Sequence, residues 1–117
     1  MALPRPYEAM KKTHPALMKA YEAFGAACAA SGPLDARSIA IIKLAVSFGA
    51  GLEGAAHSHA RKALAAGWSA EDLLHAARLC APTIGFPAMM RARQWVGDVV
   101  ESSGPKNRKP ASKTKNR

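Results

Sequence analysis

The sequence predicts an all-α protein, built as a compact bundle of helices. Apolar side chains recur three and four positions apart through most of the first hundred residues, which is the spacing of one face of an α-helix. No stretch alternates apolar and polar residues as a half-buried strand would. Apolar residues make up 49% of the 117 residues but aromatic residues only 6%, so we expect a single small domain whose core is filled by alanine and other small side chains.

Two helices are expected in the N-terminal half. Thr13 is predicted to cap the first, and Gly32 to end it. Asp35 is predicted to cap the second, which runs to the glycines at 49–51. We expect this second helix to be central and buried, because its apolar residues cover most of its circumference: Ile39, Ile41, Ile42, Leu44, Val46 and Phe48.

Three further helices are expected in the C-terminal half. Gly67 ends the first of them, and a capping arrangement of Ser69 with Asp72 begins the next. The three helices cover about residues 52–66, 69–80 and 87–101, with a kink or short loop at 83–87.

The net charge of +9 is concentrated at the C-terminus. Residues 105–117 hold six of the 17 Lys and Arg and no acid, which leaves 11 cations against 8 acids, or +3, in residues 1–104. We therefore expect a helical domain over residues 1–104 and a basic, disordered tail over 105–117, because the tail has too little apolar surface to offset its ordering entropy. The tail is either a solubilising extension or a weak, salt-dependent contact to nucleic acid.

Nothing in the sequence predicts export or membrane insertion. The first residues lack the apolar stretch of a secretory signal, and the longest weakly polar run, residues 39–52, is shorter than the roughly 20 residues that a membrane span needs. Cys28 and Cys80 lie far apart in unrelated contexts, which excludes a disulfide framework and favours free thiols. We therefore expect a cytoplasmic protein without membrane contact.

The residues that could carry chemistry are concentrated in the segment 51–67, GLEGAAHSHARKALAAG. On a helix, His59 shares a face with small apolar residues, whereas His57 lies toward one edge with Glu53 four positions before it. His59 is either a general acid or base beside a cavity, or a core histidine bonded to a backbone carbonyl. Glu53 is expected to orient His57. The two histidines point about 200° apart, so one helix cannot aim both at a single ion, and we expect no metal site and no cofactor.

Lys43 is the single charge in the apolar segment 39–48. Burying an unpaired ammonium group is costly, so this side chain must reach solvent, pair with a carboxylate or line a polar cavity. In the last case Lys43 would bind an anionic substrate.

Residues 34–96 resemble the carboxymuconolactone decarboxylase family, which includes alkylhydroperoxidase D. Three features carry the resemblance, which extends over roughly residues 7–101: His59 eight residues before Gly67, the capped acidic helix start SAED at 69–72, and GFP at 85–87. The resemblance implies an all-α fold of the alkylhydroperoxidase D-like type. It also implies a homo-oligomer, a trimer or hexamer, with a pocket beside His59 near the subunit contacts.

The two branches of the family differ at the residues around this histidine. The peroxidase branch places a CxxC pair seven and four residues before it and a Glu nineteen before it, where this sequence has Leu52, Ala55 and Ala40. A thiol peroxidase needs a reactive thiolate and a resolving thiol, so the resemblance disfavours an alkylhydroperoxidase- or peroxiredoxin-type antioxidant. The decarboxylase branch lacks the CxxC pair and keeps the histidine.

The resemblance therefore implies a lyase-type enzyme that acts on a small acidic metabolite. His59 would be the general acid or base, and Lys43, Arg61 or Arg91 would bind the substrate carboxylate. A non-enzymatic binding protein is the remaining alternative.

Overall fold

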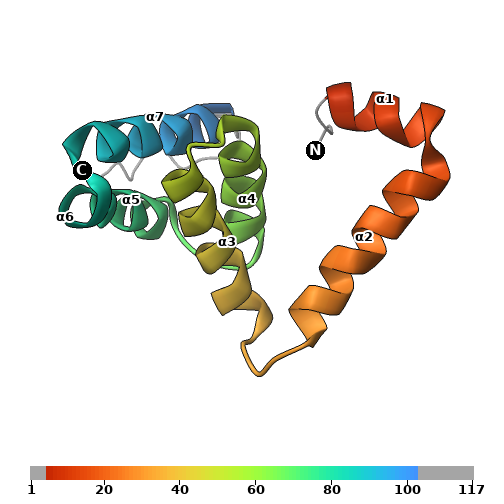
Figure 1. Cartoon of the computed structure of the whole chain (residues 1–117). Coiled ribbons are helices and arrows are strands. Elements are labelled where there is room, and N and C mark those ends of the chain that lie inside the picture. Colours follow the sequence, from red (N-terminus) through yellow and green to blue (C-terminus); the bar gives the residue numbers. More distant parts are fainter. Residues whose placement is uncertain (1–4, 103–117) are drawn as a thin grey trace. The chain divides into compact units, whose positions relative to one another are not determined.

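The computed structural model describes residues 5–102, and every regular element in that range is an α-helix (Figure 1). The all-α prediction is therefore confirmed for the described part of the chain. The chain divides into two compact units, and the boundary in the sequence falls between Leu34 and Asp35. The basic tail expected at 105–117 lies outside the described residues. None of the described helices combines the length and the apolarity that crossing a bilayer requires.

In the described part of the N-terminal unit, helices α1 (Arg5–Thr13) and α2 (Pro15–Ala30) pack on each other. The Tyr7 hydroxyl donates a hydrogen bond to the carboxylate of Glu22, and Lys11 Nζ lies 3.9 Å from the same carboxylate. Two residues of α1 thus hold one acidic side chain of α2.

The predicted cap of α2 at Thr13 is wrong. Thr13 is the last residue of α1, and its Oγ1 donates to the carbonyl oxygen of Ala9 at 2.9 Å. His14 is the N-cap residue of α2 and makes no side-chain capping bond. The threonine hydroxyl prefers the carbonyl one turn back in its own helix, a bond that competes with capping the next one.

Over residues 35–102, the C-terminal unit has five helices around one core. They are α3 (Ala36–Ala50), α4 (Glu53–Ala65), α5 (Ala70–Arg78), α6 (Cys80–Ile84) and α7 (Phe86–Ser102). Helix α3 packs on α4, and α7 packs on α4, α5 and α6 (Figure 1). Alanines supply much of the core, as the composition predicts, and let the helices approach closely. The core residues are Leu44, Phe48, Ala56, Ala60, Ala63, Leu73, Ala77, Cys80, Ala92, Trp95, Val96 and Val99.

Helix α3 is less buried than the sequence predicts. Its inner side consists of Leu44, Ser47 and Phe48, but Ile42 is 43% exposed and Val46 is 63% exposed. The expectation of a central, buried helix was wrong for the outer face, because α3 presents only one face to its neighbours. Its outer face stays apolar.

The predicted caps of α3 and α5 are confirmed. Asp35 Oδ1 accepts a hydrogen bond from the Ser38 backbone N–H at 2.8 Å, which begins α3. Ser69 and Asp72 form a reciprocal capping box at the start of α5, with N···O distances of 3.0 and 2.8 Å. Both carboxylates accept backbone N–H groups that would otherwise have no partner in the first turn.

The turn between α4 and α5 is fastened to the start of α3. Gly67 has φ +104°, a conformation that side-chain-bearing residues rarely adopt. The Arg37 guanidinium lies 3.8 Å from the centre of the Trp68 ring, and Trp68 Nε1 donates to the Arg37 carbonyl at 2.8 Å. This pair fixes where α4 ends relative to α3.

The connection between α5 and α7 contains more helix than predicted. Helix α5 ends at Arg78, and the short α6 (Cys80–Ile84) occupies part of the segment expected to be a loop. The direction changes at Gly85, whose φ of +109° a residue with a side chain rarely adopts. Helix α7 then begins at Phe86 and runs along α4.

Candidate functional site

Helix α4 carries both candidate histidines and lies between α3 and α7. Gly51, with φ +71°, ends α3, and the Leu52 N–H donates to the Ser47 carbonyl at 3.1 Å, so that α4 begins at once. The side of α4 that faces the core is made of Ala56, Ala60 and Ala63. At about 100° per residue, His57 and His59 fall on opposite flanks of this alanine stripe. Each histidine therefore meets a different neighbouring helix.

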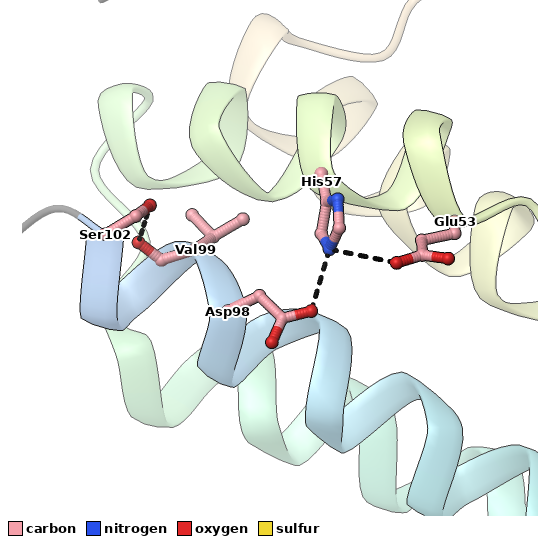
Figure 2. Close-up of polar contacts among 5 residues, drawn as sticks. All are labelled: Glu53, His57, Asp98, Val99 and Ser102. Carbon is pink, nitrogen blue, oxygen red and sulfur yellow. Dashed lines mark hydrogen bonds and ion pairs between the residues drawn. The ribbon is translucent and has the colours of Figure 1, made fainter.

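His57 faces helix α7. Its Nε2 lies 3.0 Å from Oδ2 of Asp98 and 4.0 Å from Oε2 of Glu53, one turn earlier in α4 (Figure 2). The imidazole side chain is only 24% exposed, whereas the carboxylates of Glu53 and Asp98 are 63% and 44% exposed. His57 is therefore held between two acidic side chains from two helices. One turn further along α7, Ser102 Oγ donates to the Val99 carbonyl at 3.1 Å.

The sequence reasoning missed Asp98. It expected Glu53 to orient His57, but the nearer carboxylate belongs to Asp98, 41 positions away. The signal that could have found it is positional. Asp98 directly precedes the buried Val99 on an amphipathic helix, so its carboxylate lies at the edge of the packed face.

His59 lies on the other flank and is partly buried. Burial in the first place, and the positive charges of Lys62 and Lys43 in the second, lower the pKa of His59 from 6.5 to about 4. At neutral pH the ring is consequently the uncharged imidazole, able to accept a proton. Lys43 comes from α3 and Lys62 from the next turn of α4, so the positive charges that lower the pKa of His59 come from two helices.

The three predicted substrate-binding cations have different surroundings. Lys43 is exposed, and its positive charge lowers the pKa of His59. Arg91 lies by the turn between α3 and α4. Its guanidinium is 5.5 Å from the centre of the Trp95 ring, and it would lie 3.6 Å from the Cβ atom of any side chain introduced at Gly51. Arg61 is half-buried on α4, and its charge is not among those that shift His59.

Lys62 acts on His59 although the sequence reasoning did not select it. The spacing of three residues places the two side chains on adjacent turns of α4, which is the signal that could have identified it. Lys62 thus joins Lys43 as a cation whose charge lowers the pKa of His59.

The two thiols have different surroundings. Cys28 is exposed on α2, and Cys80 is buried at the start of α6. Burial raises the pKa of the Cys80 thiol, and the positive charge of Arg91 opposes this effect only in part. A raised pKa is the opposite of what a peroxide-reducing thiol requires.

Within residues 5–102, Glu53, His57 and Asp98 are the side chains that could hold a metal ion together, with their ligand atoms all within 4.8 Å of one another. The expectation of no metal site was drawn from His57 and His59, which lie on opposite flanks of α4. The cluster instead combines His57 with Glu53 of the same helix and Asp98 of α7.

Over the described residues, these observations define a small all-α protein in which a histidine-bearing helix packs on α3 and α7. The model of the carboxymuconolactone decarboxylase family matches residues 15–98, and the chain belongs to this family. The match confirms the resemblance stated from the sequence, and it includes α2 to α6, most of α7 and all of the predicted site residues. Comparisons with curated proteins and with solved structures gave no significant match.

Proposed function

We propose that this protein is a decarboxylase-type enzyme that acts on a small acidic metabolite, such as a carboxylated lactone, with His59 as the general acid or base. The observations that support the proposal are the partial burial of His59 and the lowering of its pKa, by burial first and then by the charges of Lys62 and Lys43, in a chain of the carboxymuconolactone decarboxylase family. The enzyme would be cytoplasmic and would need no cofactor.

The two lysines give the site its preference for an anionic substrate. Lys43 from α3 and Lys62 from α4 both act on the His59 ring, so a carboxylate bound between them would lie beside the imidazole. Ammonium groups attract carboxylates and form charge-assisted hydrogen bonds with them. A bound carboxylate would also place a negative charge at the site, which raises the pKa of His59 against the lowering by burial and by the two lysines and favours a protonated ring.

The chemical step needs one proton delivered at carbon. The bond between the substrate carbon and its carboxylate breaks, carbon dioxide leaves, and the electron pair moves into the conjugated lactone. The His59 imidazolium then gives its proton to the carbon that has lost the carboxylate and returns to the neutral form. The lysines stabilise the negative charge that develops on the lactone in this step.

A thermal-shift screen tests the substrate class. Small dicarboxylates and carboxylated lactones should raise the melting temperature of the full chain, and uncharged lactones of the same size should not. Lys43→Met and Lys62→Met should each raise the Kd of the compound about tenfold and so reduce the thermal shift at a given concentration. This is the effect of losing one charge-assisted contact. Lys19→Met, on the exposed side of α2, is the matched control and should respond as the wild type does.

The proposal is wrong if none of the acidic compounds stabilises the protein. It is equally wrong if the stabilisation is the same in the wild type and in the Lys43 and Lys62 variants, because the binding site would then lie elsewhere.

A further inference from the structure

We propose that Glu53, His57 and Asp98 form a binding site for a divalent transition-metal ion, with Zn²⁺ as the best-fitting example. This site goes beyond the function proposed above, because it lies on the flank of α4 that faces α7, whereas His59 lies on the flank toward α3.

The distances between the three candidate ligand atoms suit a small ion. His57 Nε2 is 3.0 Å from Asp98 Oδ2 and 4.0 Å from Glu53 Oε2, and all three atoms lie within 4.8 Å of one another. Ligands that sit about 2.1 Å from a tetrahedral Zn²⁺ are roughly 3.4 Å apart, so the observed separations bracket the required one. The three side chains come from two helices and point to one spot (Figure 2). A small rotation of the exposed Glu53 side chain would complete the geometry.

The donor set fits the same class of ion. One imidazole nitrogen and two carboxylate oxygens are ligands that Zn²⁺, Co²⁺, Ni²⁺ and Mn²⁺ accept, and three protein ligands leave a position for water. The two ionised carboxylates carry two negative charges, which a divalent ion would balance. The exposure of Glu53 and Asp98, 63% and 44%, gives the ion a path from solvent.

A simple ion pair accounts for only part of this arrangement. The single N–H at His57 Nε2 serves one acceptor, and Asp98 at 3.0 Å takes that place. The Glu53 oxygen, at 4.0 Å, is beyond hydrogen-bond distance from the same nitrogen, yet it faces the same spot. A cation held by all three groups explains the second carboxylate as well as the first.

Calorimetric titration of the full chain with ZnCl₂ tests the site. The protein should carry no affinity tag, and the Cys28→Ser, Cys80→Ser background removes the thiolates as competing ligands. We expect one Zn²⁺ per chain and a rise in melting temperature that a chelator reverses. Glu53→Gln and Asp98→Asn should each weaken the affinity by about tenfold or more, and His57→Ala should abolish binding. His75→Ala, at an exposed histidine on α5, is the control and should bind as the parent does.

Absence of saturable binding of Zn²⁺, Co²⁺, Ni²⁺ and Mn²⁺ up to about 100 µM overturns the proposal. Binding that keeps its full affinity in Glu53→Gln or in Asp98→Asn also overturns it. The Glu53→Gln variant keeps the test decisive if His57→Ala fails to fold, because Glu53 is exposed and the change is nearly isosteric.

Discussion

His57 Nε2 on α4 lies 3.0 Å from Asp98 Oδ2 on α7, although 41 positions separate the two residues. Two positions after His57, the partly buried His59 has its pKa lowered, by burial first and then by the charges of Lys62 and of Lys43 on α3. The two histidines of α4 thus have different electrostatic surroundings. His57 lies between two carboxylates, whereas the pKa of His59 is lowered by burial and by two ammonium groups. We therefore assign them separate roles.

The contact between His57 and Asp98 should contribute to stability even without metal. In the presence of a chelator, Asp98→Asn should lower the free energy of unfolding by about 0.5 kcal/mol, a small effect because the carboxylate is partly exposed. Urea denaturation measures it, with Glu101→Gln on the same helix as the control for loss of one negative charge. Stability equal to or above that of the wild type would show that the contact contributes nothing.

Two capping carboxylates should make the fold sensitive to acid. Hydrogen bonds from the Ser38 and Ser69 backbone N–H groups, as the largest cause, hold the pKa values of Asp35 and Asp72 below the ordinary 3.8. A lowered folded-state pKa stabilises the fold above the unfolded value, and this stabilisation is lost as the pH falls through the folded value. The melting temperature should therefore fall below about pH 4, and the Asp35→Asn, Asp72→Asn double variant should show a flatter acid limb. An identical acid limb in the double variant would contradict this assignment.

The two cysteines should differ in reactivity, and neither should support peroxide turnover. An aromatic disulfide reagent should modify the exposed Cys28 quickly and the buried Cys80 slowly, because burial raises the pKa of the Cys80 thiol. The wild type should not reduce alkyl hydroperoxides by dithiol turnover. Robust peroxide consumption that disappears in the Cys28→Ser, Cys80→Ser variant would favour the antioxidant alternative.

The protein should self-associate in solution. Helix α2 exposes three large apolar side chains four and three positions apart, Leu17, Tyr21 and Phe24, and α3 exposes Ile42 and Val46. Surfaces of this kind are buried between copies in many small proteins. Light scattering should give a multiple of the chain mass, and Phe24→Glu should reduce it while Lys19→Glu should not. A monomer at micromolar concentration would be the contrary result.

Local signals in the sequence were sufficient for most of the fold. Asp35 and the pair of Ser69 and Asp72 mark helix starts because a cap depends on residues within one turn of it. Gly67 marks a helix end for the same reason. The burial of α3 was overestimated, because a pattern of apolar residues does not reveal how many neighbours a helix will have. Its outer residue Val46 is therefore exposed.

The candidate site was predictable only where it lies on a single helix. The spacing of His57 and His59 placed them on different sides of α4, as the structure has them. Asp98 could not be paired with His57, since that contact depends on how α7 packs along α4. Lys43 was selected for its unusual place in an apolar helix, but its effect on His59 depends on the packing of α3 against α4.

The turnover of the His59→Gln variant tests the central claim most directly. The substrate is the acidic compound that stabilises the wild type, and release of carbon dioxide is followed. If His59 moves the proton, the variant should fold and bind this compound while its kcat falls by roughly 10²–10⁴-fold, the usual contribution of a positioned acid or base. His75→Gln, the exposed control on α5, should keep the wild-type rate. A folded His59→Gln protein with an unchanged kcat, above all alongside a His57→Gln protein that has lost activity, would contradict the account.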